Sequence, residues 1–270
     1  MGRGSDDVKR AADTVASEAR SPVFIFLARC GYVVVGLLHV LIGVIALQID
    51  GGKSGSADQS GAVATVAGQP AGGILLWLGL AACAGLALWQ LDEAFLASRS
   101  KGARRARPVA TAVGKAVVFG ALAWVFAVFA VGGRKSSGGT SSDLTSALIK
   151  APGGAVLLVC IGAGLVVGGG YYAYRGISRK FLRDLKPGSH KIVLPLGITG
   201  YAAKGLVLAL VGILIIAATV TADPGKSTGL DGALRGLRGQ PYGEYLLVAV
   251  AVGLVCFGLY SVARARVGKF

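Results

Sequence analysis

The sequence predicts an all-α integral membrane protein with six transmembrane helices, arranged as three parallel two-helix repeats about a pseudo-threefold axis. Three observations lead to this fold class. Six apolar stretches alternate with short charged or glycine-rich connectors. A pattern of glycine, tyrosine and proline recurs along the 270 residues. Hydrophobic residues make up 54% of the chain and charged residues only 15%, with 43 glycines, a composition typical of packed membrane helices.

The six apolar stretches are too long for helices of a soluble core. With their interfacial flanks, each reaches the roughly 20 residues that cross a hydrocarbon layer about 30 Å thick. Only α-helices and closed barrels span lipid, and these stretches lack the alternation of barrel strands. Their centres are Tyr32–Leu47, Ile74–Leu88, Val109–Val131, Ala155–Gly170, Ile192–Val220 and Leu246–Ser261. Because Met1–Ser21 has no apolar core, we expect the first spanning helix to act as the insertion signal.

Basic residues are concentrated on one side of the predicted bundle. The N-terminal segment, the connectors after the second and fourth helices, and the tail hold 18 of them, whereas the opposite connectors hold seven. We therefore expect both termini to be cytoplasmic in a bacterial inner membrane. The net charge of +15 then reflects this topology and an attraction to anionic lipid head groups of the bilayer. The basic residues are scattered through four juxtamembrane segments, and the basic cluster Lys101–Arg107 fits anionic lipid head groups, so we expect no nucleic-acid partner.

The repeat is clearest in the first and fifth helices. Gly31-Tyr32 is followed by Gly36 and Gly43, and Gly200-Tyr201 is followed by Gly205 and Gly212 at the same offsets. Glycines seven residues apart return to nearly the same helix face, so we expect them to pack against neighbouring helices. The middle copy is more diverged, and its equivalents of Lys204, Gly205 and Gly212 are Lys115, Ala116 and Ala123.

A second part of the repeat precedes each even-numbered helix. It reads Gln69-Pro70-Ala71-Gly72, Ala151-Pro152-Gly153-Gly154 and Gln240-Pro241-Tyr242-Gly243. We expect a turn that leads into a helix, preceded by a short helix on the outer face at Ala233–Leu237 and its counterparts. Counting on from the prolines, Trp89, Tyr171 and Tyr260 are equivalent, and so are Glu93, Arg175 and Arg264. Two helices per unit give all copies the same direction, hence parallel repeats.

The expected boundaries follow from these repeats and the basic connectors. They are a polar cytoplasmic N-terminal segment 1–23, repeat 1 at 24–97, a basic cytoplasmic linker 98–108, repeat 2 at 109–175, a second basic linker 176–191, repeat 3 at 192–264, and a cytoplasmic tail 265–270.

Ionisable residues within spanning segments are costly and are candidates for function. One set forms a candidate intramembrane polar layer near the cytoplasmic side: Arg29, His39, Asp92, Glu93, Lys115 and Lys204. The cations can form ion pairs with the two carboxylates and clamp hairpins together, or extend to the interface. Alternatively they can line a vestibule that attracts anions. His39 can relay protons, or only hydrogen-bond a carbonyl oxygen.

Several common types of site are missing from the sequence. One intramembrane histidine cannot supply a bis-histidine haem, so we expect no cofactor and no metal. There is no phosphate-binding loop in a soluble setting, no nucleophile elbow and no His-Glu-x-x-His helix, so we expect no enzyme activity. The cysteines, which form no Cys-x-x-Cys pair, are expected to act as small packing residues: Cys30, Cys83, Cys160 and Cys256.

The run from Gly200 to Gly205, then Gly212 and the Gln240–Gly243 element, resembles the bacterial membrane-protein family known as domain of unknown function 1206. The resemblance extends from about Phe24 to Arg266. The first copy departs from the motif with Val35 in place of the lysine, and the second with Ala116 in place of the glycine. The resemblance implies a six-helix inner-membrane protein of three two-helix repeats. It implies no activity and no catalytic residues.

Three classes of function remain open on the sequence. The first is a non-catalytic scaffold or accessory component that binds a membrane-protein partner or a second copy through glycine-rich faces. The second is a small transporter or channel for an anionic solute, with a path along the pseudo-threefold axis. The third is a lipid-modifying membrane enzyme that uses Asp92 or Glu93 as an acid–base group.

Overall fold

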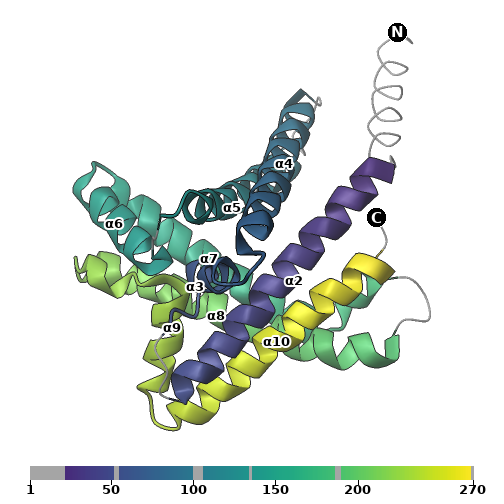
Figure 1. Ribbon diagram of the computed structural model, residues 1–270. Helices are drawn as coiled ribbons and strands as arrows, with labels where there is room; N and C mark the ends of the chain where they lie inside the picture. Colours follow the sequence, from purple (N-terminus) through teal and green to yellow (C-terminus); the bar gives the residue numbers. More distant parts are fainter. Residues whose placement is uncertain (1–21, 52–54, 100–105, 134–135, 186–189, 269–270) are drawn as a thin grey trace.

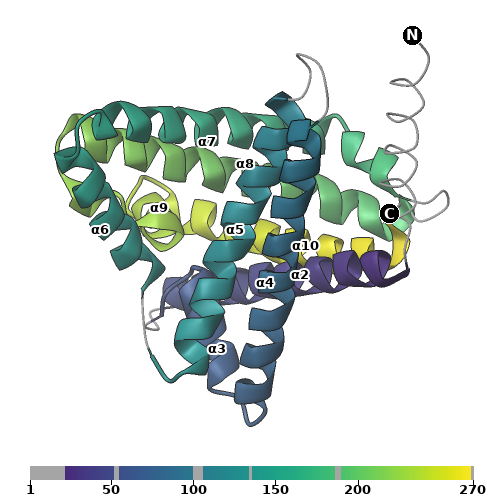
Figure 2. The ribbon, with the colours of Figure 1, turned by 90° about the horizontal axis from the view of Figure 1, so that it is seen from above.

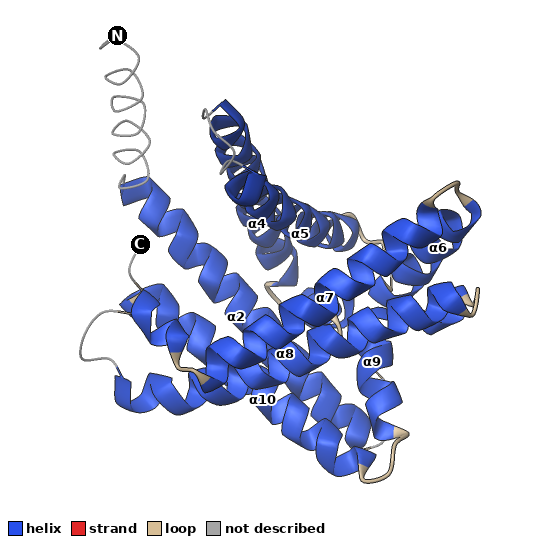
Figure 3. Cartoon of the chain, turned by 180° about the vertical axis from the view of Figure 1, so that it is seen from behind, coloured by secondary structure: helices blue, strands red, loops and turns tan. Residues whose placement is uncertain are grey.

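Six long helices and three short ones make up most of the computed structural model, which describes residues 22–51, 55–99, 106–133, 136–185 and 190–268 (Figure 1). The long helices are α2 (Pro22–Asp50), α4 (Gly72–Arg99), α5 (Ala106–Ala130), α7 (Gly154–Ile177), α8 (His190–Val220) and α10 (Gly243–Val267). Each contains a segment long and apolar enough to cross a membrane, which confirms the six predicted spans. Figure 3 shows that helix dominates and that the described loops are short.

Each repeat consists of a long helix, a short helix and a second long helix. The short helices are α3 (Gln59–Ala67), α6 (Ser137–Lys150) and α9 (Gly229–Arg238), so short helices form where the sequence predicts them. The side chains of Asp58 and Ser136 cap the first two by accepting hydrogen bonds from backbone N–H groups. Two 3₁₀ turns, η2 (Lys180–Asp184) and η3 (Pro224–Lys226), complete the chain.

The predicted proline–glycine turns lead into α4, α7 and α10. In each turn the N–H of the glycine that begins the long helix donates to the carbonyl oxygen three residues back, at 2.8–3.0 Å. The glycine is required by close approach: a Cβ atom built on Gly72 would lie 2.5 Å from the carbonyl oxygen of Ala67, the last residue of α3. The turn therefore reverses the chain within a space that only glycine fits.

The long helices pack as three pairs, which we call arms: α2 with α10, α4 with α5, and α7 with α8. Each arm joins the second helix of one repeat to the first helix of the next, and the α2/α10 arm joins the third repeat back to the first. The three repeats therefore form a closed ring. Figure 2 shows the α4/α5 arm running across the direction of the other two. Of the contacts between arms, α8 with α10 is extensive and α2 with α4 is small.

Glycines bring the helices of two arms into backbone contact. A Cβ atom built on Gly205 of α8 would lie 2.5 Å from the carbonyl oxygen of Gly169 on α7, and one built on Gly36 of α2 would lie 2.7 Å from that of Gly258 on α10. The same relation holds seven residues on, between Gly212 and Gly162 and between Gly43 and Ala251. Helices in lipid gain from this approach because dispersion contacts replace the missing hydrophobic effect.

The α4/α5 arm lacks these glycines. Ala116 and Ala123 of α5 stand at the positions of Gly205 and Gly212, and Ala87 and Leu80 of α4 stand at those of Gly169 and Gly162. Both α5 alanines are buried, with 6% and 8% of their surfaces exposed. Alanine methyl groups stand where the other arms have glycine, and Gly79 of α4 lies against the ring of Phe126 on α5, so side-chain packing contributes to this arm.

Gly31 and Gly200 pack within their own repeats. A Cβ atom on Gly31 would lie 2.7 Å from Cδ1 of Leu86 on α4, and one on Gly200 would lie 2.5 Å from Cα of Phe257 on α10. Leu86 and Phe257 are equivalent residues of the repeat, at the same offset from Pro70 and Pro241. The first glycine of the motif thus contacts the partner helix of the same repeat, whereas the two later glycines contact the neighbouring repeat.

Hydrogen bonds between the short segments close the ring a second time. Three equivalent side chains, each at the same offset before its proline, bond the backbone of the next repeat: Ser60, Ser142 and Asp231. Ser60 Oγ accepts from the N–H of Ser137 at 3.1 Å, and Ser142 Oγ donates to the carbonyl of Ser227 at 3.1 Å. Asp231 Oδ1 accepts from the N–H of Ala57 at 2.7 Å. We call these three bonds the connector ring.

Arg235 reinforces the bond that closes the connector ring. Its Nε donates to Asp231 Oδ2 at 2.8 Å, and its guanidinium also donates to the carbonyl of Gly55. Arg238 donates to the carbonyl of Ile49 at 3.1 Å, near the end of α2. Charged donors and acceptors form the stronger hydrogen bonds, so repeats 1 and 3 are held most firmly here.

Replacing Asp231 with alanine tests the connector ring. Asp231→Ala removes the acceptor of the Ala57 N–H and the partner of Arg235, and hydrogen bonds to charged groups contribute about 1.5–3 kcal/mol. We expect a clear fall in the midpoint of detergent-induced unfolding. The matched control is Asp223→Ala, which removes an exposed contact with Lys226 and an exposed hydrogen bond from the Gly225 N–H, and which should change stability by about 1 kcal/mol or less. Equal losses in the two variants would show that the ring adds nothing specific.

Candidate functional site

Five aromatic side chains meet where α7, η2, α8 and α10 come together. We call Tyr172, Phe181, Tyr201, Phe257 and Tyr260 the aromatic cluster. Tyr201 lies at its centre, with ring centroids 5.3–5.6 Å from each of the other four. Phe181 has 0% and Tyr260 1% of its surface exposed. The stacked and edge-on arrangements are those that aromatic quadrupoles favour, and such pairs add about 0.5–1.5 kcal/mol each beyond area burial.

Local glycines position the aromatic cluster on α8. Gly197 leaves room for the ring of Phe181, which enters from the α7–α8 connector, and Gly200 allows the backbone of α10 to approach at Phe257. The segment 176–191, expected from the sequence to be a basic linker, contains a 3₁₀ turn, and Phe181 and Leu185 are both buried. Leu185 also forms a backbone bridge with Gly268. The described part of this connector, up to Leu185, is therefore part of the packed core.

Lys204 places its ammonium group against the aromatic cluster. Nζ lies 4.1 Å from the ring centroid of Phe257 and 5.4 Å from that of Tyr172. In the part of the chain that the structure describes, no carboxylate pairs with Lys204. Since Lys204 lies well inside the span Val193–Val220, the faces of the aromatic rings stabilise its charge where water is scarce.

Two arginines repeat one cation–π contact around the ring. Arg264 of repeat 3 lies 4.7 Å from the ring of Tyr32 in repeat 1, and Arg175 of repeat 2 lies 5.5 Å from the ring of Tyr201 in repeat 3. Arg264 also donates a long hydrogen bond of 3.5 Å to the hydroxyl of Tyr201. In the α4/α5 arm the equivalents are Glu93 and Ala112, which cannot form this contact. The pair is thus a repeat feature that the α4/α5 arm has lost.

His39 of α2 also packs against Phe257. Its ring centroid is 4.8 Å from that of Phe257, and Nδ1 donates to the carbonyl oxygen of Val35 at 2.7 Å. This is the carbonyl hydrogen bond considered as the alternative to a proton relay. Because a carbonyl oxygen can only accept, Nδ1 carries the proton of this hydrogen bond.

The structure brings together two of the six candidate polar residues. His39 and Lys204 both contact Phe257. The other four are exposed and lie on three helices, with Arg29 on α2, Asp92 and Glu93 on α4, and Lys115 on α5. Within the described residues none of these four forms an ion pair, so they make no clamp between helices.

The four cysteines are free thiols. Cys83 is buried, Cys160 is exposed, and Cys30 and Cys256 are half-buried. Over the described ranges, no three side chains of His, Cys, Asp or Glu gather as metal ligands would.

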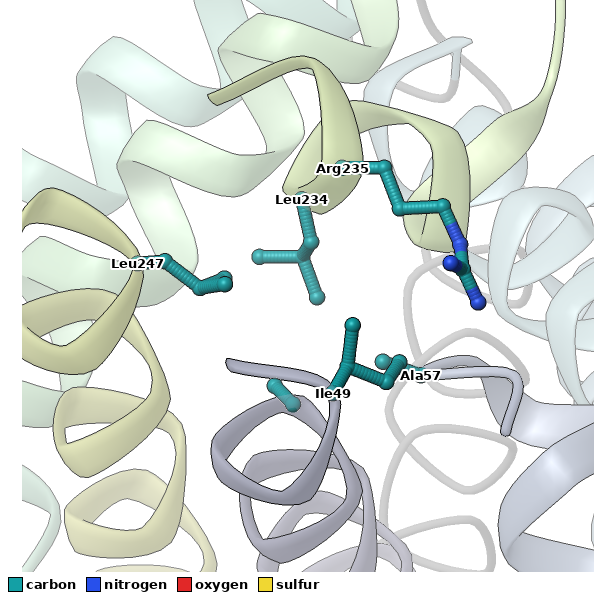
Figure 4. Close-up of a pocket in the computed structure, with 6 residues that line it drawn as sticks. Ile49, Ala57, Leu234, Arg235 and Leu247 are labelled. Carbon is teal, nitrogen blue, oxygen red and sulfur yellow. The ribbon is translucent and has the colours of Figure 1, made fainter. Parts of the chain in front are cut away.

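A narrow apolar gap lies directly beside the connector ring. Ile49, Ala57, Leu234, Arg235 and Leu247 surround it, with the guanidinium of Arg235 pointing away from the apolar side chains (Figure 4). The gap is too small for a water molecule. It is part of the packed junction between α2, α9 and α10, and it offers no room for a ligand.

The same repeat is found in a known family. The model of the Domain of Unknown Function (DUF1206) family matches three times, at residues 30–97, 110–179 and 199–268. The chain belongs to this family. Each match spans one long–short–long unit of the fold, which confirms the three repeats. The chain is 29% identical over 245 residues to "Uncharacterized protein YxxB" of Bacillus subtilis (strain 168), a match that covers 87% of this chain and 88% of that protein. No solved structure matches the chain.

The sequence does not identify the aromatic cluster of this DUF1206 protein as a site, although part of the signal is present. Tyr201 belongs to the Gly-Tyr motif, and the equivalence of Tyr260 with Tyr171 and of Arg264 with Arg175 was visible from the prolines. What the sequence lacked was the pairing of the helices, which brings each arginine onto the tyrosine of the next repeat. Phe181 carried no signal, because a single aromatic residue in a basic connector is common.

Proposed function

We propose that this DUF1206 protein is a non-catalytic membrane component, a scaffold or accessory subunit that holds another membrane protein against its α4, α5 and α7 surfaces. The supporting observation is the distribution of glycines. In α2, α8 and α10 every glycine lies against a neighbour. In α4, α5 and α7, seven glycines have nothing within 4 Å of a built Cβ atom: Gly73, Gly85, Gly114, Gly120, Gly164, Gly168 and Gly170.

Open glycines in a membrane helix are better suited to a helix partner than to lipid. Small residues are enriched where transmembrane backbones approach each other, and they give lipid tails little surface to contact. The neighbouring side chains are large and apolar, and they include Trp77 on α4, Trp124 on α5 and Val167 on α7, each more than half exposed. A partner helix that enters beside such residues would bury both kinds of surface.

The proposed topology has both termini in the cytoplasm of a bacterial inner membrane. Its support is the excess of basic residues in the N-terminal segment, the tail and the two long connectors. A phosphatase or fluorescent reporter inserted at Lys226 should report the outer side, and one placed after Val267 the inner side. The same side for both insertions would overturn this topology.

Affinity purification of the wild-type protein and of one double variant tests the scaffold role. The full-length protein, extracted from its own membrane in a mild detergent, should retain a membrane protein in stoichiometric amount. Gly114→Leu with Gly120→Leu should lose it, because the leucines occupy a face of α5 where a built Cβ atom has nothing within 4 Å. An unchanged unfolding midpoint shows that the variant is folded. If the partner remains bound, or if none copurifies, the scaffold role is wrong.

Transport of an anionic solute is the second candidate function, and three cations that contact the aromatic cluster favour it. Lys204, Arg175 and Arg264 surround Tyr201 and Tyr172. If the protein is a transporter, the purified chain in liposomes should move a radiolabelled anion such as phosphate, and Lys204→Met should abolish the flux. Flux in the wild type would replace the scaffold proposal. A lipid-modifying enzyme ranks third, because Asp92 and Glu93 are exposed and pair with no other described side chain.

A further inference from the structure

The α4/α5 arm lacks one contact that the repeat makes elsewhere. In repeats 1 and 3 the first helix packs on the second through Gly31 with Leu86 and Gly200 with Phe257. The equivalent residues of repeat 2 are Thr111 on α5 and Gly168 on α7. A Cβ atom built on Gly168 has nothing within 4 Å, and α5 is not packed along α7 among the described residues.

From this difference we infer that the open face of α7 at Gly164 and Gly168 is a docking surface for α5 of the same chain, and that the α4/α5 arm has a second, closed position in which Thr111 packs on Gly168. This inference goes beyond the proposed function, and it removes Gly164 and Gly168 from the surface offered to a partner protein. Closure gives repeat 2 the contact that repeats 1 and 3 already have. All three arms are then joined pairwise, and the pseudo-threefold arrangement is complete.

The side chains at the two positions suit each other. In repeats 1 and 3 a glycine on the first helix faces a large residue on the second, Leu86 or Phe257. In repeat 2 the glycine is on the second helix and the larger residue, Thr111, is on the first. The small partner has changed sides, but one small residue remains at the crossing, so close approach of the backbones is preserved.

The register of the two helices also matches. In repeat 3 the crossing pair is Gly200 and Phe257, on helices whose connector ends are Val220 of α8 and Gly243 of α10. In repeat 2 the corresponding connector ends are Ala130 of α5 and Gly154 of α7. Thr111 lies 19 residues before Ala130, and Gly200 lies 20 residues before Val220. Gly168 and Phe257 each lie 14 residues after the first residue of their helix. A swing of the arm about its connector end is therefore sufficient, with no sliding of α5 along its axis.

The connections of the arm permit this swing. At its connector end the α4/α5 arm is tied to the other repeats by α3 and by the bond from Ser137 to Ser60, and its remaining contact with α2, at Leu86 and Gly31, is small. Thr111 is near the opposite end of α5, about 29 Å from Ala130 at a rise of about 1.5 Å per residue. Small rotations at the turn before Gly72 and at Gly132 displace Thr111 more than they displace residues near the connector end. Gly132 has a φ of 79°, and glycine adopts positive and negative φ at little cost.

A buried polar atom in the arm gives a second, independent reason for closure. Lys115 is the equivalent of Lys204, whose ammonium lies between the preceding repeat at Tyr172 and its own repeat at Phe257. The equivalents around Lys115 are Gln90 and Gly168. Oε1 of Gln90 is buried and has no hydrogen-bond partner in the described structure. In the closed position the ammonium of Lys115 is turned inward, where it donates to this oxygen.

Disulfide cross-linking in native membranes tests closure. Thr111→Cys and Gly168→Cys are introduced into the full chain with its four cysteines replaced, and a protease site is inserted at residue 134, between α5 and α7. Thr111 is exposed and Gly168 faces open space, so both replacements keep the fold. After oxidation and cleavage we expect the two halves to stay joined several-fold more often than in the control, Thr111→Cys with Ile161→Cys, two turns away on α7.

Two results would overturn the inference. One is cross-linking no greater than the Ile161 control while a Val40→Cys and Val255→Cys pair in the α2/α10 arm links efficiently. The other is a disulfide that joins two chains, which would assign the open face to a second copy. As a second readout, spin labels at exposed Val118 and Val167 should give two distance populations. A single long distance would contradict closure.

Discussion

Gly169→Leu is expected to destabilise the protein by about 3 kcal/mol, because overpacking at a site without space forces backbone shifts. Gly169 lies against the carbonyl oxygen of Gly205, and the crossing of α7 and α8 depends on that approach. A leucine there pushes the two helices apart along the whole arm. The measurement is the midpoint of SDS-induced unfolding in mixed micelles.

The neighbouring residue supplies the control for this experiment. Gly170→Leu makes the same chemical change one position along α7, where a built Cβ atom has nothing within 4 Å. We expect a change within about 0.5 kcal/mol, as for a surface substitution. If Gly170→Leu is as damaging as Gly169→Leu, the loss comes from helix propensity or insertion, and the α7/α8 crossing is not the cause.

Phe181→Ala is expected to cost about 3–5 kcal/mol, the usual range for removing a buried aromatic ring. Phe181 is fully buried against Tyr201 and Tyr260. Its loss leaves a cavity in the centre of the aromatic cluster and frees the α7–α8 connector. The control is Phe26→Ala, because Phe26 is 65% exposed and should change the unfolding midpoint little.

Phe181→Leu tests whether the volume of the ring accounts for this loss. Phe181→Leu keeps most of the volume and should recover much of the stability lost in Phe181→Ala, since volume-conserving swaps usually cost less than about 1.5 kcal/mol. No difference between the leucine and alanine variants would mean that the ring does not fill the site, contrary to the burial of Phe181.

The fold was predictable from the sequence in its elements, because each element depends on local signals. The first apolar stretch at Tyr32–Leu47 is within a few residues of the span Arg29–Ile49, and the proline before Gly72 marks the start of α4. The pairing of the helices was not predictable. Gly36 and Gly43 identify a packing face, but any helix with a small residue in register fits it, and the partner proves to be α10, at the other end of the chain.

The candidate site was predictable only in its charges. Lys204 is conspicuous because an ammonium in an apolar helix is costly, whereas the rings that stabilise it belong to separate segments that only the fold brings together. Arg29, Asp92, Glu93 and Lys115 carry the same sequence signal, yet they lie on exposed surfaces. Position along a helix gives the depth of a charge but does not give its partner.

The closed ring, with α10 packed on α2, is the central feature of this structure, and one cross-link tests it most directly. Val40 lies against Gly258, and Val255 lies against Gly43. In native membranes, with the four cysteines replaced, a short bismaleimide should join Val40→Cys to Val255→Cys within a single chain. Absence of this link, or a link only between two chains, would contradict the ring.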